Sequence, residues 1–195
     1  MSRLLLWRHG LTAWNAEGRI QGQLDPPLAE EGVRQAEKAA ELLAALAPRL
    51  IVSSDLSRAR LTAAELAART GLPVALDERL RERHWGEWQG ATHAELAVSD
   101  PERYAAWRDG GPVDVPGAES NAEVGVRVAA ALIEHAPEDG VAVVVSHGGA
   151  LKHGLARLIS VPALGPVLRG LDNCRWSEVQ RRGEGWVLGA HNVGA

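Results

Sequence analysis

The chain has 195 residues and a formal net charge of −4 at pH 7, with 46% hydrophobic and 24% charged residues. This composition is typical of a globular protein large enough to bury a core, and its acidic balance gives no support to a nucleic-acid partner. Cys174 is the single cysteine, so no intramolecular disulfide can form. Neither a signal peptide nor a run of about 18 apolar residues that would span a membrane is recognised. We therefore expect a cytoplasmic protein without a membrane partner.

Short apolar runs alternate with helical patterns along the chain. The runs typical of buried strands are residues 4–7, 50–54, 73–76 and 141–145. Helical spacing occurs over residues 30–47, 56–71, 101–108, 124–136 and 148–159. Residues 174–180 and 185–192 resemble a terminal hairpin, with Cys174 in its first strand. This alternation predicts an α/β fold with three α/β/α layers and a mainly parallel central sheet, in one domain over residues 1–195.

The ends of these helices carry recognisable signals. Pro48 follows the pattern at 30–47, and Gly71 lies where the pattern at 56–71 should end. Ser120 and Glu123 have the spacing of a capping box before the next helix. The Gly- and Pro-rich stretch 109–118 is expected to be a long surface loop within the domain.

Charged and titratable residues follow three of the predicted strands. Arg8 and His9 follow residues 4–7, Arg58 comes soon after 50–54, and His147 follows the strand at 141–145. In open α/β sheets, ligands bind beyond the carboxyl ends of the strands. If these strands are neighbours, the four side chains converge into one cationic pocket, and guanidinium groups match the geometry of phosphate oxygens. A metal site on the two histidines fits less well, because the adjacent guanidiniums repel a cation.

The segment "RHGLTAWN" at residues 8–15 resembles the signature of the histidine phosphatase superfamily, also called the phosphoglycerate-mutase-like family. The stretches "SSDLSRARLTA", "LRERHWGEWQG", "PGAES" and "SHGG" occur in the order and approximate spacing of that family. The resemblance extends from residue 4 to about residue 155. Five motifs in order make a chance match improbable.

The resemblance implies hydrolysis of a phosphomonoester through a phosphohistidine, with no metal and no cofactor. His9 would be the nucleophile, and Arg8, Arg58 and His147 would hold the phosphoryl oxygens. Glu82 matches the general acid of the family, which then acts as the base for water. Glu87 is a weaker candidate for the same role.

The substrate side is less clearly marked. Asn15 matches the phosphate-pocket asparagine of the family, and Thr12, Gln21 and Gly22 lie in the loop that usually lines the substrate. Arg83 and His84, with Arg81, are candidates to meet a substrate carboxylate. Trp14, Trp85 and Trp88 fit a pocket wall and core packing equally well. Except for His84, the remaining histidines are expected to be structural or superficial: His93, His135, His153 and His191.

Two other functions stay open at this point. One is a cofactor-dependent phosphoglycerate mutase, although such proteins are usually longer through an insertion in the middle region. The other is a non-catalytic module that binds a phosphorylated ligand. The stretches "RIQGQLD" and "LIVSSDLSRA" are similar to those of actinobacterial glucosyl-3-phosphoglycerate phosphatases, so a phosphoglycerate or a sugar phosphate is the expected type of small-molecule substrate. The terminal hairpin offers an edge strand for a homodimer.

Overall fold

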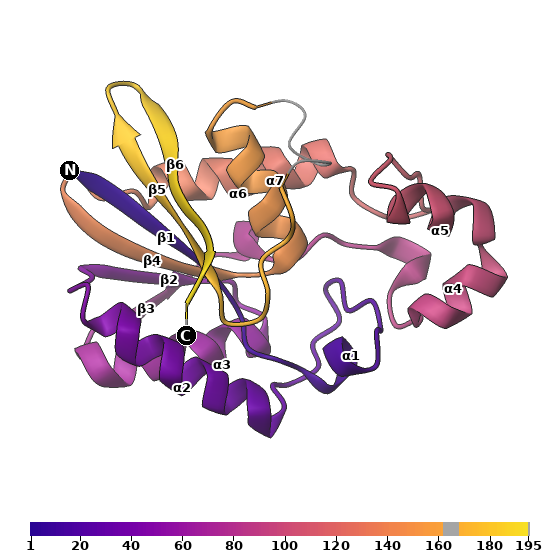
Figure 1. The fold of residues 1–195 in the computed structure, drawn as a ribbon, viewed down its shortest axis with the longest axis horizontal. Helices are drawn as coiled ribbons and strands as arrows, with labels where there is room; N and C mark the ends of the chain where they lie inside the picture. Colours follow the sequence, from indigo (N-terminus) through magenta and orange to yellow (C-terminus); the bar gives the residue numbers. More distant parts are fainter. Residues whose placement is uncertain (162–167, 195) are drawn as a thin grey trace.

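The computed structural model describes residues 1–161 and 168–194, and its centre is a six-stranded sheet (Figure 1). The strands are β1 (Ser2–Arg8), β2 (Leu50–Ser53), β3 (Val74–Leu76), β4 (Gly140–Ser146), β5 (Trp176–Arg182) and β6 (Gly185–Val193). Their order is β3-β2-β4-β1-β5-β6. The first four strands in this order pair in parallel, while β5 pairs antiparallel with both of its neighbours, β1 and β6. The mainly parallel sheet predicted from the sequence is confirmed.

Helices cover both faces of the sheet (Figure 1). On one face lie α2 (Glu30–Ala44) and α3 (Ser57–Thr70); on the other lie α6 (Asn121–Glu134) and α7 (Gly148–Leu158). Successive side chains of a strand point to opposite faces. Leu4 and Leu6 of β1 accordingly pack in the cluster with α6 and α7, and Leu5 and Trp7 pack in the cluster with α2 and α3. The three-layer α/β/α architecture is therefore built on two separate cores.

A smaller group of elements lies beside the sheet, at the right of Figure 1. It contains the 3-10 turn η2 (Gly86–Trp88), α4 (His93–Ser99) and α5 (Pro101–Arg108), and we call residues 85–118 the side lobe. Trp88, Leu96 and Val115 of this lobe pack with Ile20 in a third cluster. The prediction of a surface loop over 109–118 is wrong for Val115, whose side chain is only 2% exposed. Packing against Trp88 and Leu96 draws it inside.

The helix-end signals are confirmed and one strand boundary is wrong. Gly71 ends α3 in the left-handed conformation at φ +71°, and the Ser120–Glu123 capping box begins α6. Cys174 is buried but precedes β5, in a turn with φ +57°. The amide of Arg175 donates to the carbonyl of Asp172 in that turn, so the strand begins only at Trp176.

Two short helical segments complete the fold: α1 (Ala13–Ala16) and the 3-10 turn η1 (Glu78–Leu80). The sequence patterns indicated neither of them, nor α4. Within residues 1–161 and 168–194, no helix is both long enough and apolar enough to cross a membrane.

Candidate active site

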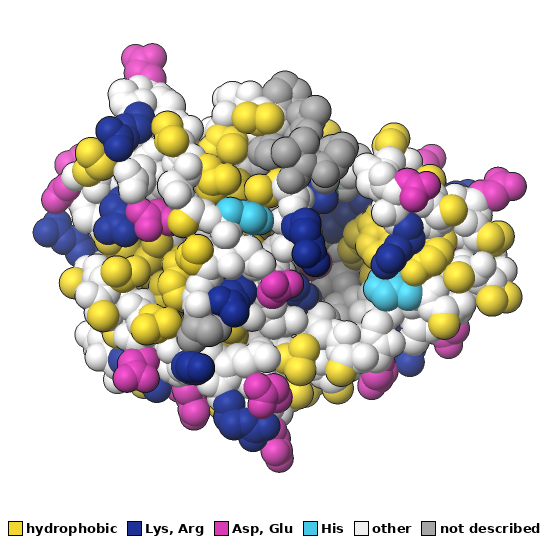
Figure 2. Space-filling view, viewed as in Figure 1, with side chains coloured by type: hydrophobic (Ala, Val, Ile, Leu, Met, Phe, Trp, Pro, Cys, Tyr) yellow, Lys and Arg dark blue, Asp and Glu magenta, His cyan; other side chains and the backbone are white. Residues whose placement is uncertain are grey.

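Three neighbouring strands deliver the predicted cationic residues to one edge of the sheet. His9 follows β1 and His147 follows β4, and α3 places Arg58 one turn beyond the end of β2. Because β2, β4 and β1 are adjacent, these side chains meet as expected. They border a cavity of about 480 Å³, visible as the hollow with dark blue side chains near the centre of Figure 2.

His9 is almost completely buried, and its ring centroid lies 5.1 Å from that of His147. Nδ1 of His9 lies 2.7 Å from the carbonyl oxygen of Gly10. A carbonyl can only accept a hydrogen bond, so Nδ1 carries the proton and Nε2 keeps its lone pair. Burial, followed by the charges of Arg58 and Arg8, holds the pKa of His9 well below its usual 6.5. His9 is therefore a neutral imidazole at pH 7.

The side chain of His147 is fully buried. Its Nε2 is 2.9 Å from Oγ of Ser54, at the end of β2. Burial and the charges of Arg58, His9 and Arg8 hold its pKa well below 6.5. The described residues that line the cavity do not include His147.

The two guanidinium groups are anchored to the backbone through their terminal nitrogens. Nη1 of Arg8 donates to the carbonyl of Leu171 at 2.6 Å, and both Nη atoms of Arg58 donate at 2.8 Å to the carbonyls of Leu24 and Gly22. Burial lowers the pKa of Arg58 to about 10, which still leaves it protonated at pH 7.

Three buried nitrogen atoms at this edge of the sheet have no hydrogen-bond partner among the described residues: Nε of Arg8, Nε of Arg58 and Nδ1 of His147. A buried donor without an acceptor costs about 1–3 kcal/mol. An anion with several oxygens, bound between these groups, would offset that cost. The arrangement therefore fits a phosphoryl group.

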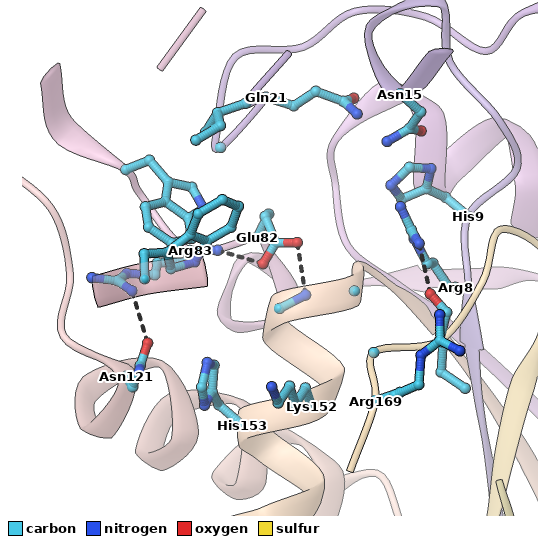
Figure 3. A pocket seen from close by; sticks show the side chains of 18 of the residues that line it. Arg8, His9, Asn15, Gln21, Glu82, Arg83, Asn121, Lys152, His153 and Arg169 are labelled. Carbon is cyan, nitrogen blue, oxygen red and sulfur yellow. Dashed lines mark hydrogen bonds between the residues drawn. The ribbon is translucent and has the colours of Figure 1, made fainter. Parts of the chain in front are cut away.

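Glu82 faces the cavity from the segment after η1 (Figure 3). Its carboxylate accepts hydrogen bonds from the amides of Arg83 at 2.8 Å, Gly149 at 3.0 Å and Ala150 at 2.8 Å. Two of these amides belong to the first turn of α7, where the helix dipole also favours a negative charge. A Cβ at Gly149 would lie 2.6 Å from Oε1 of Glu82, so glycine is required for this approach. Glu87, the weaker candidate, is not among the lining residues.

The substrate-side candidates divide into two groups. Asn15, Gln21 and Gly22 line the cavity, and Oε1 of Gln21 is buried with no partner in the described residues. Thr12 does not line it: the Thr12 hydroxyl accepts the amide of Asn15 at 3.1 Å and caps α1. Asn173, which no sequence motif indicated, donates from Nδ2 to Oδ1 of Asn15 at 3.2 Å.

Arg83 lines the cavity but is already engaged with the protein. Its Nε donates to the carbonyl of Glu119 at 2.6 Å and its Nη1 to Oδ1 of Asn121 at 2.8 Å. The guanidinium also lies 4.1 Å above the ring of Trp85. His84 is outside the lining, with Nδ1 2.9 Å from the carbonyl of Gly117. Of the two candidates for a substrate carboxylate, Arg83 therefore borders the cavity and His84 does not.

The tryptophans have three different surroundings. Trp85 lines the cavity, whereas Trp88 belongs to the core of the side lobe, where the two rings stack 5.8 Å apart. Trp14 is not among the lining residues and lies 5.6 Å from the guanidinium of Arg19.

Sequence reasoning missed several lining residues: Arg19, His93, Trp107, Asn121, Lys152, His153 and Arg169. His93 and His153, expected to be structural or superficial, both border the cavity. On α7, Gly148 lies four residues before Lys152, and Gly149 lies four residues before His153. Residues at this spacing are neighbours on one helix face. That spacing after the "SHGG" motif was the available signal. Of the others, His93 and Trp107 come from the side lobe, Arg169 from the segment before β5, Arg19 from the loop after α1 and Asn121 from the start of α6. No periodic sequence pattern points these side chains inward.

No cluster of three or more His, Cys, Asp or Glu side chains with the arrangement of a metal site occurs among residues 1–161 and 168–194. The chemistry this pocket offers with its own residues is anion binding by cations and hydrogen-bond donors, beside one neutral imidazole and one carboxylate.

Comparison with known proteins identifies the class that this fold and site define. The family model of the histidine phosphatase superfamily (branch 1) matches residues 4–194. The chain belongs to the histidine phosphatase superfamily.

The relatives agree with this assignment. A glucosyl-3-phosphoglycerate phosphatase of Mycobacterium tuberculosis is 43% identical over 188 residues, which cover 91% of this chain and 84% of the relative. A probable phosphoglycerate mutase of Enterobacter is 36% identical over 96% of this chain and 88% of its own length. Among solved structures, mycobacterial glucosyl-3-phosphoglycerate phosphatase in complex with VO3 superimposes with a TM-score of 0.92 at 42% identity, covering all of both chains.

Proposed function

We propose that this chain is a phosphatase that hydrolyses the phosphomonoester of a small metabolite through a phosphohistidine at His9. One observation carries the proposal: Nε2 of the neutral His9 keeps its lone pair, and buried nitrogens of Arg8, Arg58 and His147 at the same edge of the sheet have no partner in the described part of the chain. A nucleophile next to unpaired donors is suited to attack phosphorus, because phosphoryl transfer depends mainly on positioning and electrostatic stabilisation.

The reaction proceeds in two steps. Nε2 of His9 attacks phosphorus, the ester P–O bond breaks, and Glu82 gives a proton to the leaving alcohol. A water then attacks the phosphohistidine, Glu82 takes a proton from that water, and inorganic phosphate leaves. Arg8, Arg58 and His147 stabilise the charge on the phosphoryl oxygens in both steps.

The cavity is large enough for a substrate bigger than inorganic phosphate. Its volume of about 480 Å³ is within the range of sites that hold metabolites. Relatives act on glucosyl-3-phosphoglycerate, and we propose that this chain takes a phosphoglycerate or a sugar phosphate. A single domain over residues 1–195, a cytoplasmic location, the absence of a nucleic-acid partner and a homodimer formed through the β5–β6 hairpin stay predictions.

A second candidate function is a phosphoglycerate mutase, favoured by the 36% identity to the probable mutase of Enterobacter. A mutase would convert 3-phosphoglycerate into 2-phosphoglycerate, whereas the phosphatase releases inorganic phosphate. The two products from one incubation separate these functions. A module that only binds a phosphorylated ligand would give neither product.

The central test is hydrolysis of p-nitrophenyl phosphate in excess EDTA. We expect the wild type to be active and His9→Ala to lose at least about 1,000-fold in kcat, because the nucleophile is removed. His135→Gln is the matched control, since His135 lies outside the cavity and contacts Asp77. Acid-labile phosphate trapped on His9 supports the covalent route. Loss of wild-type activity in EDTA would contradict it.

A further inference from the structure

The cavity is lined by more positive charge than a phosphoryl group requires. Among residues 1–161 and 168–194, six cationic residues border it: Arg8, Arg19, Arg58, Arg83, Lys152 and Arg169. Glu82 and Asp172 are the acidic residues among the lining side chains, although the chain as a whole has a formal net charge of −4. A phosphomonoester dianion accounts for part of this excess. The remaining cations indicate a second anionic group on the ligand.

Four of the six cations are already assigned. Arg8 and Arg58 form the phosphoryl clamp described above. Arg19 donates to the carbonyl of Gly90 and to a carboxylate oxygen of Glu17. Arg83 is bonded to Glu119 and Asn121.

Lys152 and Arg169 differ from the other four. Within residues 1–161 and 168–194, neither side chain makes a hydrogen bond or an ion pair, although both line the cavity. Asp172, the nearest acidic residue along the chain to Arg169, instead accepts a hydrogen bond from Nδ2 of Asn192 at 2.9 Å. Two cations therefore border the cavity without forming an ion pair with any described residue.

The fold positions Lys152 relative to the reacting groups. It lies on α7 four residues after Gly148, on the helix face that also brings Gly149 against Glu82. In Figure 3, Lys152 and Arg169 are on the opposite side of the pocket from Gln21, with Glu82 between them and the Gln21 side. A ligand whose ester oxygen meets Glu82 would thus extend its alcohol half towards Lys152.

We propose that Lys152, together with Arg169, forms a second anion subsite that binds a carboxylate on the alcohol half of the phosphomonoester. This inference rests on the proposed phosphatase function and names its substrate class. A carboxylate is favoured over a second phosphoryl group because the phosphoryl end of this cavity uses two buried guanidiniums and two imidazoles. One lysine and one exposed arginine match a singly charged group.

Lys152 is then a specificity-determining residue that takes no part in the phosphoryl step. Its contact with the carboxylate is the same in the ground state and the transition state. Its loss should therefore raise KM for substrates with a carboxylate and leave kcat largely unchanged.

The test compares two ligands that differ only in the group at issue. 3-Phosphoglycerate carries a carboxylate where glycerol 3-phosphate carries a hydroxymethyl group. Each is titrated as a competitor of p-nitrophenyl phosphate hydrolysis, so a binding constant is obtained whether or not it is turned over. The variant is Lys152→Met, and the matched control is Lys38→Met, which changes the chain's other lysine on the exposed face of α2.

In Lys152→Met we expect the affinity for 3-phosphoglycerate to fall about 10- to 100-fold, the usual effect of losing a charge-assisted hydrogen bond, and that for glycerol 3-phosphate to fall less than about 3-fold. Arg169→Gln should act in the same direction and Lys38→Met should have no effect. The inference would be overturned if the affinities for both ligands fell equally, or if neither Lys152→Met nor Arg169→Gln lost affinity for 3-phosphoglycerate. If the wild type hydrolyses no phosphomonoester, the proposed function fails; calorimetric titration of the same ligand pair then decides separately whether the subsite exists.

Discussion

The carbonyl of Gly10 determines which nitrogen of His9 can react. It accepts the Nδ1 proton at 2.7 Å, so the lone pair is on Nε2. A protonated imidazole would have no lone pair for attack. The low pKa of His9 is therefore as important to the proposed chemistry as the hydrogen bond, and its causes are burial and two neighbouring guanidiniums.

The role of the neighbouring charge can be tested by removing it. Arg58 is the largest electrostatic cause of the lowered pKa of His9, after burial. In Arg58→Met, we expect the pKa of His9 to rise, because a positive charge no longer opposes protonation. NMR titration of the labelled imidazole measures this directly. An unchanged or lowered pKa would show that the charge of Arg58 does not control the protonation of His9.

Gly149 allows Glu82 to reach the first turn of α7. In Gly149→Ala, the new Cβ would lie 2.6 Å from Oε1 of Glu82 and push the carboxylate out of its place. We expect kcat to fall about 10- to 100-fold, the range that misplacement of a general acid produces, with a small effect on thermal stability.

Gly185→Ala is the control for this substitution. It lies at the start of β6, and the nearest atom to an added Cβ is 3.9 Å away. The kinetic comparison uses p-nitrophenyl phosphate and an ester of a poorer leaving group. A loss of kcat in Gly149→Ala that is the same for both esters would argue against Glu82 as the general acid, since the good leaving group needs less proton donation.

At the scale of elements, the start of α3 depends on a residue from a distant loop. Leu56, at the N-cap position, has no side-chain cap. Asp25 supplies it: its carboxylate accepts the amide of Ser57 at 2.8 Å and the Ser57 hydroxyl at 2.8 Å. The same carboxylate lies 3.7 Å from Nη1 of Arg58. One side chain therefore fixes both the helix end and the phosphoryl clamp.

Asp25→Ala should reduce the free energy of unfolding by about 0.5–2 kcal/mol, the usual cost of losing a helix cap. It should also raise KM for p-nitrophenyl phosphate, because Arg58 loses a support. Asp25→Asn keeps the capping oxygen and removes the charge, so most of the stability should return. Denaturant unfolding and steady-state kinetics measure the two effects. Equal destabilisation in both variants would show that the charge, not the cap, is what matters.

The sequence predicted the elements whose patterns are local. Each core strand is a short apolar run, and helix ends such as Gly71 carry their own signals. Of the side lobe, only the helix at residues 101–108 was predicted. The core of the lobe was missed because it joins Ile20, Trp88, Leu96 and Val115, which come from separate segments of the chain. No periodic pattern records such contacts.

The residues of the candidate site also fall into those that local patterns predict and those that they do not. His9 and His147 follow strands, so their meeting could be predicted from topology alone. Asp25 and Asn173 act through loops, and Arg169 precedes a turn rather than following a strand. Arg83 was expected to meet substrate, and only the structure reveals that Glu119 and Asn121 already hold it. Hydrogen bonds between distant loops leave no mark in a single sequence.

At the scale of the whole molecule, burying the histidines should make stability depend on pH. Burial and the nearby arginines hold the pKa values of His9 and His147 well below 6.5 in the folded protein. In the unfolded chain both titrate near 6.5, so below that pH the unfolded state binds more protons. The free energy of unfolding should therefore fall as the pH drops below 6.5, by up to about 1.4 kcal/mol per pH unit for each histidine.

Urea unfolding at pH 7.5 and at pH 5.5 measures this loss. Carboxyl groups do not account for it: the pKa of Asp77, for example, is lowered to about 2 by its hydrogen bond to Arg79, so its contribution is lost only as the pH falls below 3.8. The double variant His9→Gln and His147→Gln should lose less stability than the wild type over the same interval, because two of the groups that bind protons on unfolding are gone. His153, whose pKa burial lowers to about 4, keeps a smaller dependence in that variant. Equal losses in the two proteins would mean that the buried imidazoles already bind protons in the folded state, and the neutral nucleophile proposed for His9 would then be wrong.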